Sequence, residues 1–410
     1  MRNFSRTTII IATAVAFTSI LSSCGSSSST PTTVPNSATI FYAHNLVFRN
    51  STTLSTGYNA FGQLGYVENG GQLANRTVPG PLNAFFPFAG VAQGGVHSVA
   101  FFNNSTVRCW GYNGFGQLGN KTTTFSGTPI KTVDISGVKA VAAGGFHTLA
   151  LKNDDTLWAW GKNDLGQLGV GSGVTDEVSK NGYSTVPVKV FSGTVSGGFS
   201  NISSIAANGH HSLARANGLV WSWGLNSSGQ VGIDPATTGA MSAPNVVSGL
   251  PASGISAIAA GGGFSYAIDK NGNVWAWGAN SNGQLGNGTI TQSFTPGKVK
   301  TSDGTDLSNV VQIAAGIQHG LARDKVGNVW AWGYNFFGQL GNNNKIDSPV
   351  AVKVLDASGV QLTGATDIRA FGSSSMAKVG KVWYVWGDNT YGQLGTGSTG
   401  IVPIPVISGF

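Results

Sequence analysis

Short runs in which apolar and polar residues alternate dominate the chain from residue 38 to the C-terminus. In Leu157–Trp160 the two tryptophans recur at period two, and the polar stretch Asn153–Asp155 before them is typical of a hairpin turn. A further segment, such as Pro187–Val190, opens with proline, which suits a strand start or an outer edge because proline donates no ladder hydrogen bond. No helical periodicity interrupts these runs. The pattern therefore predicts short strands and an all-β fold.

One ten-residue motif, WGxNxxGQLG, occurs seven times in this part of the chain. Its first glycines are Gly57, Gly111, Gly161, Gly224, Gly278, Gly333 and Gly387, and successive ones are separated by 54, 50, 63, 54, 55 and 54 residues. The first copy has Thr56 where the other six have tryptophan. A period of this length is typical of propeller blades and solenoid coils, and the strands expected in each unit favour an antiparallel propeller blade.

The WGxNxxGQLG motif and the AAGxxHxxAL element before it resemble the regulator of chromosome condensation repeat, over residues 38–410. The resemblance implies an all-β, seven-bladed β-propeller. The chain starts inside one repeat, near His44, and ends on the proline strand Pro403–Val406 of another. We expect these two partial units to complete one blade, so that N- and C-terminal strands close the ring and cover their own edges.

The residues that recur in every repeat are expected to build the scaffold. The eleven tryptophans lie just before the turn motif, where large rings can be buried between neighbouring blades. Five histidines share one slot on different blades: His44, His97, His147, His211 and His319. Such a spread cannot gather ligands around one metal ion, so we expect each imidazole to bond to backbone within its own blade. In GQLG, the glutamine amide is expected to hold turn carbonyls and the leucine to fill the core. No cofactor and no metal is predicted.

The N-terminal segment has the order of an export signal. Arg2 and Arg6 precede the apolar run Ile9–Leu21, which is shorter than the roughly 20 residues that cross a bilayer. Leu21-Ser22-Ser23-Cys24 resembles a bacterial lipobox, which implies cleavage after residue 23 and a lipid on Cys24. The alternative is an ordinary signal peptide with a chance cysteine. We therefore expect a signal peptide over 1–23, a lipidated Ser/Thr/Pro-rich tether over 24–37 and the propeller over 38–410.

The charge of the chain does not favour a nucleic-acid partner. Only 10% of residues are charged, and loss of residues 1–23 leaves 21 Lys and Arg against 16 Asp and Glu, a formal charge of +5. No basic run is interleaved with aromatic residues, as nucleic-acid binding would favour. Cys109, beside Trp110 inside a predicted strand, is expected to be a buried, unreactive thiol.

Departures from the repeat period are the best candidates for a binding site, because function resides in sites added to a fold. The 63-residue spacing places an insertion at Val170–Val186, a candidate binding loop that carries Asp176, Glu177, Lys180 and Tyr183. A second irregular stretch, Tyr66–Pro87, is interpreted as a displaced outer strand.

Three functions remain open from the sequence. The leading hypothesis is a non-enzymatic protein-interaction module, a monomer held by its lipid at the bacterial cell envelope outside the cytoplasm, with an unknown envelope or extracellular protein as partner. The resemblance implies guanine-nucleotide exchange as an alternative. The third hypothesis is carbohydrate or peptidoglycan binding through Tyr58, Phe115, Phe336 and Tyr391.

Replacement of the lipobox cysteine tests the predicted anchor. Cys24→Ser should abolish palmitate labelling and release an unprocessed or soluble form, because the acceptor thiol is lost. Cys109→Ser removes the other cysteine of the chain and is the matched control, in which labelling should persist. Labelled Cys24→Ser protein would contradict the anchor.

Overall fold

The computed structural model describes residues 43–49, 52–67, 71–82, 88–171, 182–191, 199–251 and 254–410. The chain divides into two units, Met1–Asn36 and Ser37–Phe410, and every described residue belongs to the second. Within these ranges the regular structure consists of 27 β-strands in seven antiparallel sheets, with no helix. The predicted all-β fold is confirmed.

Each sheet is one blade, and its strands follow one another in the sequence. Blade 1 contains β1 (His44–Arg49), β2 (Thr52–Gly57) and β3 (Arg76–Pro81). Blade 2 contains β4 (Phe88–Gln93), β5 (His97–Phe102), β6 (Val107–Gly111) and β7 (Ser126–Lys131). Blade 3 contains β8 (Val138–Ala143), β9 (His147–Lys152), β10 (Leu157–Lys162) and β11 (Tyr183–Lys189). Blade 4 contains β12 (Ile202–Asn208), β13 (His211–Ala216), β14 (Leu219–Leu225) and β15 (Ala240–Val246).

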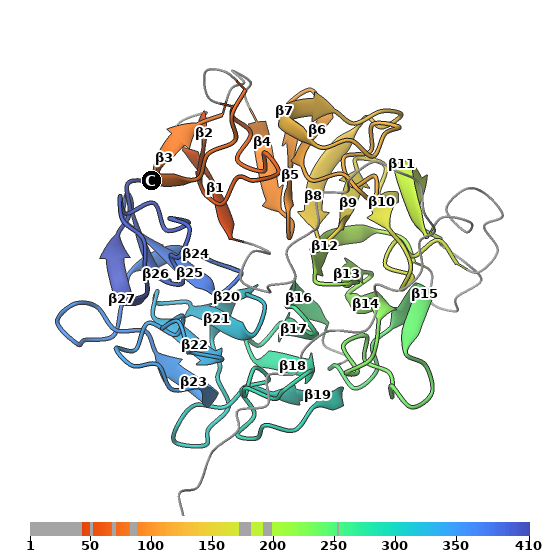
Figure 1. Cartoon of the computed structure of the whole chain (residues 1–410). Helices are drawn as coiled ribbons and strands as arrows, with labels where there is room; N and C mark the ends of the chain where they lie inside the picture. The colour runs from red at the N-terminus through yellow and green to blue at the C-terminus, as the bar shows by residue number, and fades with distance from the viewer. Residues whose placement is uncertain are drawn as a thin grey trace, which may run out of the picture. The chain divides into compact units, whose positions relative to one another are not determined.

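The remaining blades repeat the four-stranded order. Blade 5 contains β16 (Ile255–Ala260), β17 (Phe264–Asp269), β18 (Val274–Gly278) and β19 (Ser293–Lys298). Blade 6 contains β20 (Val310–Ala315), β21 (His319–Asp324), β22 (Val329–Gly333) and β23 (Ser348–Lys353). Blade 7 contains β24 (Ala365–Phe371), β25 (Ser374–Val379), β26 (Val382–Gly387) and β27 (Val402–Ile407). The first strands of blades 2–7 line an axial cavity of about 250 Å³, and the blades surround it as a seven-bladed propeller (Figure 1).

The prediction that N- and C-terminal strands close the ring is confirmed, since blade 7 meets blade 1, but the two blades share no sheet. The prediction that the two chain ends complete one blade is wrong for the described strands: β27 pairs with β26, and β3 serves blade 1 as its own outer strand. The closing contacts are hydrogen bonds between blades, from Thr56 Oγ1 to the Gln393 carbonyl (2.9 Å) and from Gly397 N to the Thr77 carbonyl (2.8 Å). The C-terminus accordingly lies beside β3 (Figure 1). Because β3 falls within Tyr66–Pro87, the interpretation of that stretch as an outer strand is confirmed.

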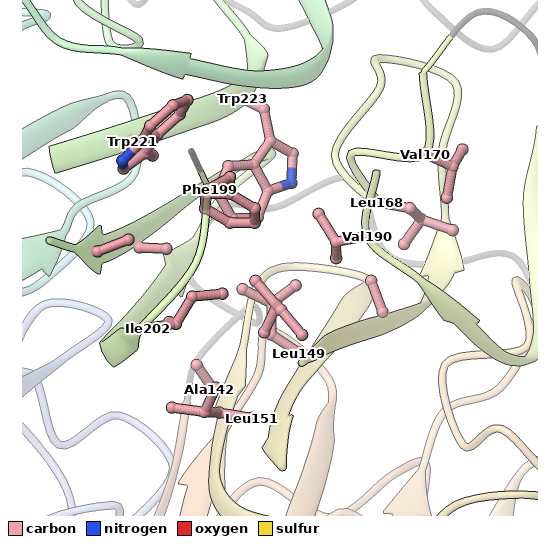
Figure 2. Packing of buried hydrophobic residues seen from close by; sticks show 14 residues of the cluster. Ala142, Leu149, Leu151, Leu168, Val170, Val190, Phe199, Ile202, Trp221 and Trp223 are labelled. Atoms are coloured by element: carbon pink, nitrogen blue, oxygen red, sulfur yellow. The ribbon is translucent and has the colours of Figure 1, made fainter. Parts of the chain in front are cut away.

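Tryptophans fill the junctions between blades, as predicted. The motif tryptophans are fully buried, and each packs with residues of the preceding blade: Trp110, Trp160, Trp223, Trp277, Trp332 and Trp386. Figure 2 shows the junction of blades 3 and 4, where Trp223 meets Leu149 and Val190. Burial of one large apolar side chain contributes about 1.5–3 kcal/mol, so these rings are a main source of cohesion between blades.

The motif glutamine provides the polar part of each junction through its main-chain carbonyl. Contrary to the prediction, the Gln63 side chain does not hold turn carbonyls. Its Oε1 accepts a hydrogen bond from Phe61 N at 3.0 Å, inside its own turn. Its carbonyl faces blade 2 and accepts from Trp110 Nε1 (2.9 Å) and Ser98 Oγ (2.8 Å). The tryptophan bond recurs at 2.8–3.0 Å from Trp160, Trp223, Trp277, Trp332 and Trp386 to Gln117, Gln167, Gln230, Gln284 and Gln339. Every junction between consecutive blades from 1 to 7 therefore has this bond.

The histidines also form hydrogen bonds across the junctions. The expectation that each imidazole bonds to backbone within its own blade is therefore wrong. Each Nε2 lies 2.8–3.0 Å from a hydroxyl of the following blade: His44–Ser98, His97–Thr148, His147–Ser212, His211–Ser265 and His319–Ser375. These hydroxyls donate their single proton to the glutamine carbonyl. The histidine must therefore donate from Nε2, which assigns the neutral Nε2–H tautomer.

One junction reaches the same result with other residues. Between blades 5 and 6, Phe264 occupies the histidine slot and Gly320 the hydroxyl slot. Tyr266 replaces the aliphatic residue two positions after the slot, and its hydroxyl donates to the Gln284 carbonyl. A Cβ on Gly320 would lie 2.5 Å from the Tyr266 hydroxyl oxygen, so the glycine leaves the space that the tyrosine fills.

The glycine of each GQ pair allows the turn to approach the next blade. A Cβ on Gly62 would lie 2.3 Å from Gly127 Cα, and one on Gly283 would lie 2.5 Å from Pro349 Cα. Both glycines have positive φ, 79° and 78° respectively. The turn motif is thus held against the next blade. The variable residues of successive turns therefore lie next to one another on one face of the ring.

The exceptional junction predicts a coupled substitution. Phe264→His alone should lower the free energy of unfolding by roughly 1–3 kcal/mol, because a buried imidazole gains no partner. Adding Tyr266→Leu and Gly320→Ser should recover most of this loss by recreating the bonds of the other junctions. Denaturant unfolding measures both values. Equal destabilisation of the single and triple variants would show that the three positions are not coupled.

The buried histidines predict loss of stability in acid. Burial lowers the pKa of four of them from 6.5 to about 3, namely His44, His97, His211 and His319. Burial also lowers the pKa of His147 well below 6.5. Below pH 6.5 the unfolded chain takes up protons that the folded chain does not. Stability should therefore be complete above pH 6.5 and fall toward pH 3, by about 1.4 kcal/mol per pH unit for each histidine.

Thermal melts across this pH range measure the effect. A variant that carries the blade 5–6 arrangement at the junction of blades 4 and 5 (His211→Phe, Leu213→Tyr and Ser265→Gly) is the control. It should lose stability less steeply in acid, because one fewer proton is taken up on unfolding. An unchanged slope would contradict this origin of the acid sensitivity.

Candidate functional site

The seven turn motifs lie on one face of the ring, which we call the turn face. In blades 2–7 the hairpins between the second and third strands lie on the opposite face, the hairpin face. This follows from the antiparallel order, since the third strand of these blades runs from that hairpin to the Trp-Gly of the motif, as β2 of blade 1 runs to Gly57. The residues that vary within the motif, and the residue before the histidine slot, are thereby gathered on the turn face.

An unbroken series of ring contacts crosses the turn face over five blades. It runs through Tyr391 (blade 7), Tyr58 and Phe61 (blade 1), Tyr112 and Phe115 (blade 2), Phe146 (blade 3) and His210 (blade 4). Successive ring centroids are 5.0, 6.4, 5.1, 6.3, 5.3 and 6.2 Å apart. We call these seven residues the aromatic band. The contacts that cross junctions exist because each turn is fixed against the next blade.

A lysine and an aspartate border the band at blade 3. Lys162 Nζ lies 5.1 Å from the ring centre of Phe115 and 5.9 Å from that of Phe146. The same ammonium forms an ion pair with Asp164 at 2.9 Å. A cation at this distance from aromatic faces is attracted to them, so Lys162 and the two rings hold one another in place.

The band has little charge of its own at neutral pH. Burial raises the pKa of the Tyr58 and Tyr112 hydroxyls above the usual 10 and lowers the pKa of His210 to about 4. The tyrosines therefore stay protonated and the histidine neutral. Apart from the Lys162–Asp164 pair, the band offers apolar ring surface with hydroxyl and imidazole groups.

The rest of the turn face differs in character. In blade 5, the positions that correspond to Tyr112 and Phe115 are Ala279 and Asn282. Blade 6 has its own aromatic cluster of Tyr334, Phe336 and Phe337, with centroids 5.1–6.4 Å apart. Within the described residues, no ring contact joins this cluster to the band. The turn face thus has an aromatic sector, a polar sector and a separate cluster.

The structure places the predicted site residues in different regions. Tyr58, Phe115 and Tyr391 belong to the band, whereas Phe336 lies in the blade 6 cluster and is 57% exposed. The residues Cys24, Asp176, Glu177 and Lys180 lie outside the described ranges.

Tyr183 was predicted to lie in a loop, and this is wrong. It is the first residue of β11 and pairs with Lys162, because the sheet extends to this point and Asn163 N donates to the Gly182 carbonyl. Val170, at the other end of the predicted insertion, is buried. The position of Tyr183 nevertheless puts it next to the lysine that borders the band.

Four members of the band were not singled out from the sequence: Phe61, Tyr112, Phe146 and His210. Phe61 and Tyr112 were visible as aromatic residues at variable motif positions, and Phe146 and His210 both directly precede the histidine slot. The sequence did not reveal that these residues, tens of positions apart, are in contact.

Three further observations concern reactivity, metal binding and membranes. Burial raises the pKa of the Cys109 thiol to about 12, so the thiol stays protonated and is a poor nucleophile. In the part of the chain that the structure describes, no three His, Cys, Asp or Glu side chains are placed to hold a metal ion. The same part contains no helix of the length and hydropathy needed to span a membrane.

A sequence-family comparison identifies the repeat. The model of the regulator of chromosome condensation (RCC1) repeat matches residues 106–151, 154–215, 217–268, 271–323, 326–368 and 380–409. This chain belongs to the RCC1-repeat family. The resemblance inferred from the motif is confirmed.

Several known proteins are similar to the chain over most of its length. The RCC1 domain-containing protein RUG3, mitochondrial, of Arabidopsis thaliana is 32% identical, over 74% of this chain and 55% of its own, so the match spans about half of that relative. The ultraviolet-B receptor UVR8 of Arabidopsis thaliana is 30% identical, over 84% of this chain and 74% of its own. The crystal structure of human WBSCR16 superposes with a TM-score of 0.73 at 24% identity, covering 88% of this chain and 94% of the human one, which supports the fold.

The family as a whole has a general class of function. RCC1-repeat propellers mediate protein interactions or act as exchange factors, and most of them are non-enzymatic interaction modules.

Proposed function

We propose that this RCC1-repeat protein is a non-enzymatic interaction module that binds a partner protein through the aromatic band. The observation that carries the proposal is the unbroken series of ring contacts from Tyr391 to His210. A continuous aromatic surface with few charges is typical of the centre of protein interfaces, where tyrosine and other aromatic residues contribute most of the binding energy.

The geometry of the band favours a protein over a sugar as the ligand. Phe61 meets Tyr112, and Phe115 meets Phe146, in edge-to-face contacts with interplanar angles of 62° and 76°. Phe61 is buried and the other three rings are half-buried, so rings packed in this way present edges and hydroxyls rather than flat open faces. An apolar protein surface with hydrogen-bonding groups complements such a band better than a pyranose ring does.

The partner is proposed to be an envelope or extracellular protein. Support comes from the N-terminal sequence, in which residues 1–23 have the order of an export signal and Cys24 and a Ser/Thr/Pro-rich segment follow. The thirteen residues 25–37, as a flexible tether of this composition, have a root-mean-square reach of roughly 20 Å. Lipid on Cys24 would therefore keep the propeller close to a membrane surface while leaving it free to turn toward a partner.

Transfer of one turn between blades tests the proposal. Tyr112→Ala with Phe115→Asn gives the blade 2 turn the residues of the blade 5 turn, which keeps the glutamine and glycine contacts of the junction. The change interrupts the band at its centre. We expect loss of at least about tenfold in affinity for the partner, since central aromatic residues commonly contribute 2 kcal/mol or more.

The blade 6 cluster offers a matched control. Tyr334→Ala with Phe337→Asn makes the same chemical change outside the band, and should leave binding unchanged. The measurement is quantitative mass spectrometry of envelope proteins retained by the immobilised full chain, followed by affinity measurement with the purified partner. If every retained protein binds both double variants equally, the band is not the docking site.

A further inference from the structure

A second cavity lies on the hairpin face, away from the aromatic band. It has a volume of about 590 Å³ and lies between blades 5 and 6. One wall is formed by residues 301–308 of the connection from β19 to β20, and the other by Asp324, Trp330 and Ala351–Lys353 of blade 6. Clefts of this size are typical of small-molecule sites.

The wall from blade 5 is fixed in place by backbone hydrogen bonds. Lys300 pairs with Asp306, and Thr301 N donates to the Thr305 carbonyl at 2.9 Å, so the connection forms a small hairpin. Ala351 N then donates to the Lys300 carbonyl at 2.7 Å and attaches this hairpin to the outer strand of blade 6. The cavity is therefore preformed, and a ligand need not order its walls.

Trp330 differs from the tryptophans at corresponding positions in blades 3, 4 and 5. Lys152 lies 5.6 Å from the ring centre of Trp158, and Lys298 lies 5.8 Å from that of Trp275. The blade 4 counterpart, Trp221, is fully buried. Among the described residues, no lysine or arginine covers the ring of Trp330 in this way. Its half-buried indole faces the cavity, and Asp324 accepts from its Nε1 at 3.5 Å, which orients the ring. The aromatic face that cations cover elsewhere is open to a ligand here.

Each carboxylate of the cavity already has a partner, and the polar lining is rich in hydroxyls. Asp306 is paired with Lys298 at 2.7 Å and Lys300 at 3.8 Å. Both oxygens of Asp324 accept hydrogen bonds within its own hairpin. Asp303 accepts hydrogen bonds from the hydroxyls of Thr301 and Thr305, and Lys353 is the lysine of the lining. The remaining polar lining consists of the hydroxyls of Thr301, Ser302, Thr305 and Ser308.

We propose that this cavity binds a neutral oligosaccharide, with a sugar ring stacked on Trp330. The apolar face of a pyranose matches a flat indole, and its hydroxyl groups match the hydroxyls and carboxylates opposite. A neutral ligand suits this lining, because each carboxylate is already held by an ion pair or by hydrogen bonds from the chain. The site shares no residue with the aromatic band, so it can be present or absent independently of the proposed protein docking.

Titration calorimetry of the purified full chain with chitotriose, cellotriose and maltotriose tests the site. At least one of these sugars should bind. Trp330→Ala should weaken that binding by at least about tenfold, and Trp330→Phe, which keeps an aromatic face, by no more than about threefold. Trp275→Ala removes the cation-covered counterpart in blade 5 and should leave binding unchanged.

A fold check accompanies the titration. If Trp330→Ala lowers the melting temperature enough to unfold the chain, Trp330→Leu replaces it, because leucine keeps the apolar packing without a flat ring. The proposal is overturned if none of the three sugars binds the wild-type chain, or if the alanine or leucine variant binds as tightly as wild type. Loss of sugar binding in the blade 2 double variant would likewise place the sugar on the band and overturn it.

Discussion

The main-chain carbonyl of the motif glutamine is the contact on which this ring depends. It is the meeting point of two neighbouring blades, because it accepts a hydrogen bond from the indole of the next blade and usually a second one from a hydroxyl. That hydroxyl in turn orients the histidine behind it. An indole N–H buried without this acceptor would be costly, so the large ring that supplies apolar cohesion also requires the polar contact. The glutamine carbonyl of each junction thus serves both the packing and the hydrogen bonding of the indole. The turn that contains this glutamine also contains the variable residues of the turn face.

Different residues at different junctions supply hydrogen bonds to the glutamine carbonyl. Histidine with a hydroxyl satisfies five of the junctions, while Phe264, Tyr266 and Gly320 satisfy a sixth through a tyrosine hydroxyl. At the closing junction Thr56 supplies the bond that tryptophan supplies elsewhere. The freedom left to the remaining turn positions allows an aromatic sector and a polar sector on one scaffold.

Much of the scaffold could be predicted from the sequence, because strand alternation and the motif period are local. The blade number, the outer proline strands and the burial of the tryptophans follow from those patterns. The histidine partners could not, since the hydroxyl that meets His97 is Thr148, in the next repeat, and spacing alone does not reveal which residues face each other. The aromatic band was missed in part for the same reason. Tyr58, Phe115 and Tyr391 were singled out as aromatic residues of the motif itself, whereas Phe146 joins them only through packing across a junction.

Closure between two separate sheets, instead of within a shared one, has a mechanical consequence. A pull that acts on β1 loads blade 1, which meets blade 7 at the closing junction. That junction has a threonine hydroxyl in place of the buried indole, and no histidine–hydroxyl pair, since Ser374 and Asn45 occupy those slots. Its remaining bonds can be broken one after another, whereas a continuous sheet would load its ladder bonds together. Tension on β1 would therefore open the ring first at this junction and leave the other six junctions intact.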